Sequence, residues 1–378
     1  MQPALYDWSP TLRLLIAGAL LGCVPLVWVV WRFGKRKSGW VHALTVTTLF
    51  LTFDLVLFGA FTRLTDSGLG CPDWPGCYGS ASPFGAQAQI DAAQRIMPSG
   101  PVTTSKAWIE MVHRYFATGV GFLVTVLAVV AWLRPDPQNG AGRGLTLFTL
   151  FWVCMQGAFG ALTVTMKLFP VIVTLHLLGG LGLLALLTLQ VQRQTPVARN
   201  LPHIPPPYLH RAVAAGLGLL VVQAASGAWV SSNYAVLACT QFPLCQGVWW
   251  PQMDFANGFS LWRPLGLDFQ GKPLPLEALT AIHIVHRLLA IVTLVALAAL
   301  AWRLHTVPQA RNGARALGAL LMLQLITGLS NVVLDWPMLA AVLHTGGAGA
   351  MVVVLVAVFD SVRVRLPSSA HNEMRAFA

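Results

Sequence analysis

The chain has 378 residues, of which 56% are hydrophobic and only 10% are charged, and its mean hydropathy is +0.66. This composition is too apolar for a soluble globular protein and places the chain in a lipid bilayer. The formal net charge of +11 does not indicate nucleic-acid binding, because the basic residues separate apolar segments and form no basic stripe or recognisable nucleic-acid module.

Apolar segments long enough to cross a bilayer recur along the whole chain. A spanning helix needs roughly 20 apolar residues, because the hydrocarbon core is about 30 Å thick. The sequence predicts nine such helices, over residues 12–32, 41–63, 108–133, 144–166, 171–192, 211–232, 280–303, 315–334 and 338–361. The first is interpreted as a retained helix and not as a signal peptide, because basic residues follow it and do not precede it.

Basic residues gather in the loops that nine alternating helices place on one side of the membrane. They are Lys35, Arg36, Lys37, Arg134, Arg143, Arg193, Arg199, Arg303, Arg311, Arg363 and Arg365. Such residues favour the cytoplasmic side. We therefore expect a multi-pass protein of the inner (plasma) membrane, with its N-terminus outside and its C-terminus in the cytoplasm. The long loops at 64–107 and 233–279 then lie outside, under conditions that permit disulfides.

The chain contains a tandem duplication with an offset of 168 residues. Identical residues pair at this offset as Cys71 with Cys239, Cys77 with Cys245, Gln156 with Gln324, Gly160 with Gly328, and His176 with His344. Each repeat holds four helices, and an even number gives both repeats the same orientation in the membrane. The predicted fold is an all-α integral membrane protein with two tandem four-helix bundles and one extra N-terminal transmembrane helix.

The predicted divisions follow from this duplication. They are the extra helix with its basic loop at 1–40, the N-terminal bundle at 41–192, a cytoplasmic linker at 193–210, the C-terminal bundle at 211–365 and a cytoplasmic tail at 366–378. The linker is polar and rich in proline, so it cannot continue a helix.

Four histidines near the outer ends of predicted helices are the main candidate site residues. They are His113 and His176 in the first half, and His286 and His344 in the second. An ionisable residue inside a membrane helix is costly and is therefore a functional candidate. Two histidines on different helices of one bundle can supply both axial ligands of a haem iron, whereas zinc or copper would need ligands that neither half offers. Any single histidine could instead be a hydrogen-bonded packing residue, but four at duplicated positions favour two haem sites.

The two halves differ three residues before the first histidine of each pair, where one has Glu110 and the other His283. Residues at i and i+3 share a helix face, so Glu110 predicts chemistry beside a porphyrin in the first half only. The alternative is a glutamate stabilised by the helix dipole. Arg114 and Arg287 directly follow candidate ligands and could either neutralise haem propionates or reach the membrane surface.

Four of the six cysteines lie in the two outer loops. The pairs Cys71 with Cys77 and Cys239 with Cys245 are each six residues apart, beside prolines that turn the chain, and are candidate disulfides. The pattern leaves open whether such bonds are structural or take part in redox chemistry. Cys23 and Cys154 fall within spans and are predicted to be packing residues.

Several strings, in this order, resemble the haem A synthase family over nearly the whole chain: TRLTDSGLGCPDWPGCYG, EMVHR, HLLGG, HRLLA and HTGGAGA. The resemblance implies an oxidoreductase that oxidises the C8 methyl group of haem O to a formyl group by successive hydroxylations. The product, haem A, serves cytochrome oxidase assembly. The family core has eight helices, so the extra first helix departs from its pattern.

The resemblance also assigns roles to residues. His113 and His176 would hold the substrate haem O, with Glu110 as the catalytic carboxylate. His286 and His344 would hold haem B as a cofactor. The first-loop cysteines would aid substrate capture or electron passage. Expected partners are the bilayer and haem O synthase, the farnesyltransferase that makes the substrate; the electron acceptor, the oxygen source and a homo-oligomeric state are left open.

Two other classes of protein are weighed against this hypothesis. A di-haem b-type membrane electron carrier would hold permanent haem B in both halves, and Glu110 in only one half argues against it. A transporter would have broken helices and polar residues at the membrane midplane, whereas these histidines lie nearer the outer face.

Overall fold

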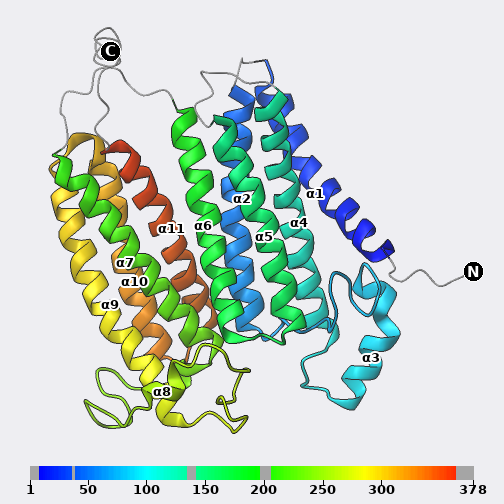
Figure 1. Ribbon diagram of the computed structural model, residues 1–378, viewed down its shortest axis with the longest axis vertical. Coiled ribbons are helices and arrows are strands. Elements are labelled where there is room, and N and C mark those ends of the chain that lie inside the picture. Colours follow the sequence, from blue (N-terminus) through cyan, green and yellow to red (C-terminus); the bar gives the residue numbers. More distant parts are fainter. Residues whose placement is uncertain (1–7, 36–38, 134–141, 196–205, 363–378) are drawn as a thin grey trace, which may run out of the picture.

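The computed structural model describes residues 8–35, 39–133, 142–195 and 206–362. Within these ranges nine helices are long and apolar enough to cross a membrane, which confirms the predicted spans and the all-α class. They are α1 Ser9–Phe33, α2 Gly39–Leu64, α4 Thr104–Leu133, α5 Gly142–Thr165, α6 Pro170–Gln194, α7 Pro207–Ser232, α9 Leu276–His305, α10 Arg311–Val333 and α11 Met338–Ser361. Figure 1 shows them standing side by side, with the longer loops at one end.

Four of these helices, α4, α7, α9 and α10, begin four residues before the predicted starts at 108, 211, 280 and 315. In α4 the extra turn is supported by the side chain of Gln94, whose Oε1 accepts a hydrogen bond from the backbone N–H of Thr104 at 3.0 Å. Hydropathy locates the apolar part of a span, but a helix can begin outside that part, so its first residue is not given by hydropathy alone.

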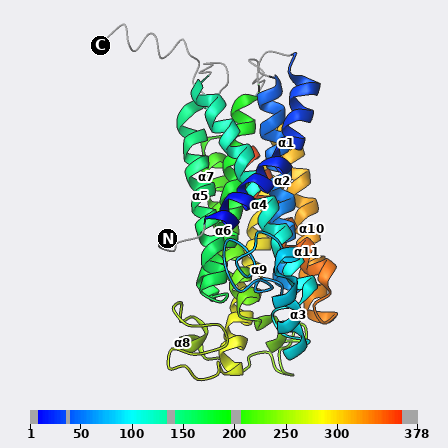
Figure 2. The same cartoon turned by 90° about the vertical axis from the view of Figure 1, so that its right-hand side faces the viewer.

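The spanning helices other than α1 form two closed rings. In the first, α2, α4, α5 and α6 each contact two ring neighbours, and α7, α9, α10 and α11 do the same in the second. The rings meet through α2 against α11, α6 against α7, and α6 against α11. In the repeat, α2 corresponds to α7 and α6 corresponds to α11. The contact between α2 and α11 is therefore equivalent to the contact between α7 and α6. The halves are thus related by an approximate twofold axis at the contact between α6 and α11, which lie side by side in Figure 1. Figure 2 views the molecule from the side of α1, so the first half stands in front of the second.

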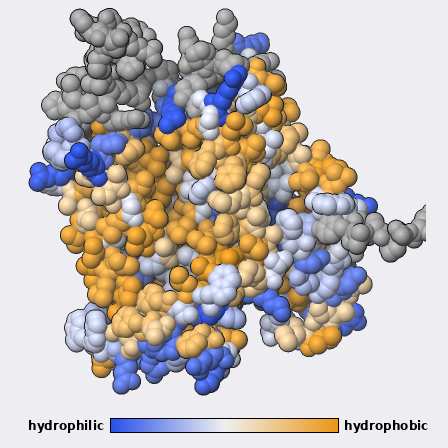
Figure 3. All heavy atoms as spheres, in the orientation of Figure 1, coloured by the Kyte–Doolittle hydropathy of each residue, from blue (hydrophilic) through white to orange (hydrophobic). Residues whose placement is uncertain are grey.

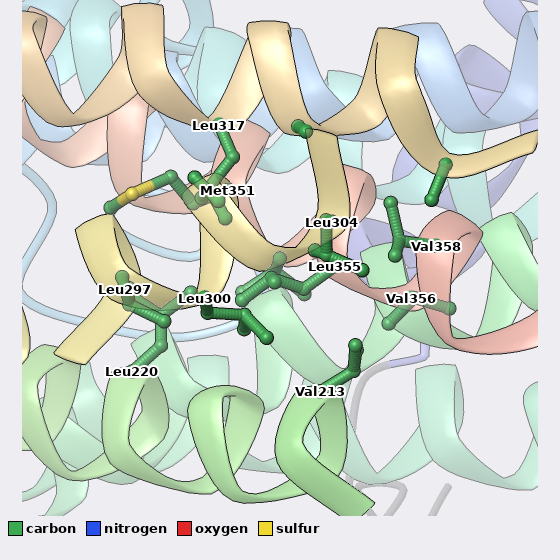
Figure 4. Close-up of a cluster of buried hydrophobic side chains, with 14 of the residues drawn as sticks. Val213, Leu220, Leu297, Leu300, Leu304, Leu317, Met351, Leu355, Val356 and Val358 are labelled. Carbon is green, nitrogen blue, oxygen red and sulfur yellow. The ribbon is translucent and has the colours of Figure 1, made fainter. Parts of the chain in front are cut away.

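The surface of the helices is apolar, and polar residues gather at both ends (Figure 3). Inside, the largest core lies within the second ring and at its border with α6. Figure 4 shows its centre, where side chains from α7, α9, α10 and α11 interlock, among them Leu220, Leu297, Leu317 and Leu355. In a bilayer this close packing, and not exclusion from water, holds neighbouring helices together.

The extra helix α1 packs along α4 and α2. A Cβ at Gly18 would lie 2.4 Å from Thr118, and one at Gly22 would lie 2.6 Å from Phe122, so only glycine permits this approach. Near the start of α1, Leu14 joins a buried cluster with Cys71 and Cys77. This helix therefore braces the first outer loop, a contact that the sequence pattern did not predict.

The outer loops contain short helices that the sequence analysis left as irregular chain. They are η1 Pro83–Ala86 and α3 Gln87–Ile96 in the first loop, and η2 Ala235–Ala238 and α8 Phe255–Gly258 in the second. A further short helix, η3 Pro308–Ala310, precedes α10 at the opposite end.

A polar contact joins the two halves at the outer end. The guanidinium of Arg63 donates to the backbone oxygen of Ser231 at 2.7 Å and to the hydroxyl of Tyr234 at 2.8 Å. Tyr234 in turn donates to the carboxylate of Asp66. Arg63 and Ser231 occupy equivalent positions in the repeats, and so do Asp66 and Tyr234. The contact therefore joins the outer end of α2 to the outer end of its equivalent helix, α7.

The predicted basic residues Lys35, Arg143, Arg193, Arg303 and Arg311 lie at the ends of the helices opposite α3 and α8 (Figure 1). Arg36, Lys37, Arg134, Arg199, Arg363 and Arg365 lie outside the described residues, as do most of the predicted linker and the tail at 366–378. The boundaries assigned from the sequence to the bundles stay predictions.

Candidate functional site

The candidate ligands of the first half come from opposite helices of the first ring. His113 lies on α4, and its Cε1 is 3.1 Å from where a Cβ on Gly59 of α2 would be. His176 lies on α6, with Cε1 3.6 Å from the corresponding point at Gly160 of α5. Each imidazole ring therefore faces a glycine on the adjacent helix, which leaves room for the ring near the helix backbone.

The second half repeats this arrangement. His286 on α9 faces Gly227 of α7, with Cε1 3.0 Å from the position of an added Cβ. His344 on α11 faces Gly328 of α10 at 3.2 Å. The four glycines pair at the offset of the duplication, as 59 with 227 and 160 with 328. The sequence analysis noted only the second pair. The structure shows that each of the four glycines faces the imidazole ring of a candidate ligand.

The ring nitrogens of these histidines suit axial ligation of a haem iron. No hydrogen bond reaches the Nε2 of any of the four within the described part of the chain. Among the same residues, no group of three or more histidine, cysteine, aspartate or glutamate side chains is placed to hold a metal ion. Two imidazoles per half fit a haem, which needs two axial ligands, and do not complete a tetrahedral zinc site.

The second nitrogen, Nδ1, distinguishes the halves. In the second half the Nδ1 of His286 lies 2.8 Å from the hydroxyl of Ser226, and that of His344 lies 3.0 Å from the hydroxyl of Thr327. In the first half the Nδ1 atoms of His113 and His176 are buried and have no hydrogen-bond partner.

Glu110 is deeply buried, with 4% of its surface exposed. One carboxylate oxygen accepts a hydrogen bond from the backbone N–H of Cys71 at 2.8 Å, and the other accepts one from the guanidinium of Arg114. The counterpart in the second half, His283, is equally buried, and its Nδ1 lies 3.0 Å from the backbone oxygen of Ala235. Both residues therefore tie the ligand-bearing helix to the outer loop, but only the first half has a carboxylate there.

The two arginines beside the candidate ligands both point into the outer loops. Arg114 donates to the backbone oxygens of Asp73, Pro75 and Gly76, in addition to Glu110. Four bonds from one guanidinium to the loop and to Glu110 favour a role in holding the loop.

Arg287 makes the equivalent contacts in the second half, with the backbone oxygens of Cys239, Gln241 and Leu244. Its Nε has no partner. Propionate contacts by either arginine stay a prediction.

Both predicted cysteine pairs are bonded in the structure. Cys71 and Cys77 have Cα atoms 4.9 Å apart, and Cys239 and Cys245 have Cα atoms 4.8 Å apart, within the normal range for disulfides. The first disulfide adjoins the carboxylate, because the N–H that binds Glu110 belongs to Cys71. Cys23 is partly buried and Cys154 exposed, and both are free.

Two charged residues were missed by the sequence analysis. Asp54 lies in the middle of α2 with an exposed side chain, and the rule that ionisable residues inside a span are functional candidates would have found it. Arg263 in the second outer loop is 0% exposed, donates to the side-chain oxygen of Asn233 at 2.6 Å and lies over the ring of Trp229. Only the fold reveals its burial.

Comparisons with known proteins show the family of this chain. The sequence profile of the COX15-CtaA family, described as cytochrome oxidase assembly protein, matches residues 42–358 and so leaves out α1. The heme A synthase of Shewanella oneidensis is 40% identical over 311 residues, which are 82% of this chain and 93% of the relative. That of Caulobacter vibrioides is 29% identical, with 84% and 94% of the two chains covered, and that of Sphingopyxis alaskensis is 31% identical, with 78% and 84% covered. The chain belongs to the COX15-CtaA family of cytochrome oxidase assembly proteins.

Proposed function

We propose that this protein is a haem A synthase, an oxidoreductase that converts the C8 methyl group of haem O to a formyl group by successive hydroxylations. The observation that carries the proposal is the duplicated histidine pair with a buried carboxylate at only one of the two sites. The relatives named heme A synthase, and their coverage of the chain, support the same reaction.

The first half is assigned to the substrate. His113 and His176 would hold the iron of haem O through their Nε2 atoms, beside glycines that leave space for the rings. Glu110 is three residues from His113 on the same helix, so its carboxylate is on the face that carries the ligand. The N–H of Cys71 and the guanidinium of Arg114 fix both of its oxygens. A carboxylate held in this way can orient water or accept a proton from the carbon that is oxidised.

The second half is assigned to a permanent haem B, held by His286 and His344. A bound haem there would supply one-electron redox chemistry, and the chain's own task is to hold it rigidly. We assign the protein to the plasma membrane, with the loops that carry the disulfides outside and the C-terminus in the cytoplasm, because the basic residues lie at the opposite end. The bilayer and haem O synthase are the proposed partners.

The decisive test is the content of extracted haem from protein made in cells that also produce haem O. Wild-type protein should yield haem B together with haem O, haem A or a hydroxylated intermediate in chromatography and mass spectrometry. Glu110→Gln should keep both haems but lower formyl production by about 100-fold or more. Glu277→Gln, an exposed glutamate at the start of α9, is the matched control and should behave as wild type. Two molecules of haem B per chain and no haem O or haem A would instead identify an electron carrier.

A further inference from the structure

The hydroxyls beside the second histidine pair fix which nitrogen of each ring carries the proton. Ser226 uses its single hydroxyl proton on the backbone oxygen of Gln223 at 2.8 Å, so its oxygen can only accept from the Nδ1 of His286. Thr327 likewise donates to the backbone oxygen of Leu323 at 2.7 Å and can only accept from the Nδ1 of His344. We therefore assign the proton of both rings to Nδ1, which leaves the lone pair of Nε2 free to ligate iron.

A third polar side chain supports the ring of His286. The amide of Gln223 lies 3.2 Å from Nδ1, and its Oε1 is buried without a partner. Rotating this amide by 180° would turn the oxygen toward the same N–H. The second half therefore surrounds the Nδ1 of His286 with two side chains that can accept its proton.

The first half has apolar residues at all three equivalent positions. At the repeat offset of 168, Phe58 replaces Ser226, Phe159 replaces Thr327 and Leu55 replaces Gln223. The ring of Phe58 stacks on His113, with centroids 6.0 Å apart and planes 13° apart. A phenyl ring cannot accept the Nδ1 proton as a hydroxyl does, so the N–H groups of this pair are left unsatisfied.

A glutamine near the second ligand of each half shows the same difference. Gln324 donates through Nε2 to the backbone oxygen of His344 at 2.8 Å. Its counterpart Gln156 is buried, and neither atom of its amide has a hydrogen-bond partner. The lack of hydrogen-bond partners in the first half thus extends beyond the two histidines to the side chain of this glutamine.

Such partners change both the hold on a metal and its electronic properties. An acceptor for the second N–H fixes the ring orientation and makes the imidazole a stronger donor, and loss of such a partner typically weakens metal binding by about 10–100-fold. A stronger donor also favours the ferric state and lowers the reduction potential.

We propose that Ser226 and Thr327 are positioning residues that make the second half a site of permanent haem retention, and that Phe58 and Phe159 make the first half a site of exchangeable haem. This rests on the proposed function, in which the first half must bind substrate and release product while the second keeps its cofactor. The same pair of axial histidines would serve both tasks because its surroundings differ.

The test uses full-length protein in detergent, loaded with both haems in cells that make haem O. Haem transfer to excess apomyoglobin is timed, and haem B and haem O are separated by chromatography so that each half is followed independently. Ser226→Ala and Thr327→Val should release haem B about 10–100-fold faster and shift its midpoint potential to more positive values. Ser330→Ala, one turn from Thr327 on α10, is the matched control.

Two further variants keep the proposal falsifiable. Ser226→Thr retains a hydroxyl and should restore slow haem B release and the wild-type potential, so failure of this rescue would overturn the proposal. Phe58→Ser combined with Phe159→Thr should slow release of haem O by about 10-fold or more, and an unchanged rate would also overturn it. If wild-type protein contains no haem B that depends on His286, the proposed function fails instead, and the two failures are thus distinguishable.

Discussion

The two halves of this molecule share helices, candidate ligand histidines and facing glycines, yet they differ in several of the groups next to those histidines. The first half has a carboxylate, Glu110, and unpartnered imidazole N–H groups. The second has His283 in place of the carboxylate, and hydroxyl partners for both ligands. The comparison shows that a duplication can preserve one scaffold while neighbouring side chains diverge, and in our proposal this divergence assigns one half to chemistry and the other to haem retention.

The largest expected effect is the loss of haem B when a candidate ligand of the second half is replaced. His286→Ala or His344→Ala should remove haem B completely, because an iron with one axial ligand and an unfilled cavity is held weakly. His113→Ala should leave haem B in place and abolish haem A formation. Absorbance spectra and extracted haems of each purified variant measure this, with His305→Ala at the exposed end of α9 as the control. Equal loss of haem B from all three site variants would contradict the division of tasks.

The next largest effect is the loss of stability when Arg114 or Arg287, which hold the outer loops, is replaced. Arg114→Gln removes the only ion-pair partner of a buried carboxylate among the described residues and should destabilise the protein by about 3–5 kcal/mol. Arg287→Gln breaks only bonds to backbone oxygens and should cost about 1–3 kcal/mol. Thermal unfolding in detergent compares them, and a larger loss for Arg287→Gln would contradict the assigned contacts.

Removing a disulfide should have a smaller effect on stability, and its effect on haem A production should differ between the halves. Replacing either pair by serine removes a bond that closes a short loop and should cost about 2 kcal/mol. Only the first pair should also lower haem A production, because Cys71 donates its backbone N–H to Glu110. The measurement pairs unfolding temperature with haem A yield for Cys71→Ser/Cys77→Ser and Cys239→Ser/Cys245→Ser. An equal loss of yield in both would argue against the link between loop and carboxylate.

The smallest effect concerns the contact between the halves. The side chain of Asp66 is 55% exposed where it meets Arg63, so Asp66→Asn should cost less than about 1 kcal/mol. Tyr234→Phe removes hydroxyl contacts with both Arg63 and Asp66 and should cost slightly more. Unfolding at low and high salt checks this prediction, since an exposed pair is screened by ions. A change in haem content in either variant would assign this contact a larger role.

Much of this protein could be predicted from its sequence, because a bilayer imposes simple constraints. Nine apolar segments correspond to nine candidate spans among the described residues, and the duplication identified the equivalent histidines, with an offset of 168 for His176 and His344 and of 173 for His113 and His286. The cysteine spacing indicated both disulfides. Four helix starts were missed by four residues, and in α4 the extra turn is bound by the side chain of Gln94, which lies outside the apolar segment. Asp54 could have been found by the same rule that identified the histidines.

The sequence by itself indicated the membrane class, the duplication, the candidate ligand residues and one of the positions that distinguish the halves, Glu110, because each depends on hydropathy, spacing or residue type. Only the tertiary structure decided that Glu110 binds the N–H of Cys71, that the two arginines hold loop carbonyls, and that Ser226 and Thr327 face the second histidine pair. These contacts join different helices and loops, and a hydrogen bond between such segments depends on packing geometry that local sequence patterns do not encode.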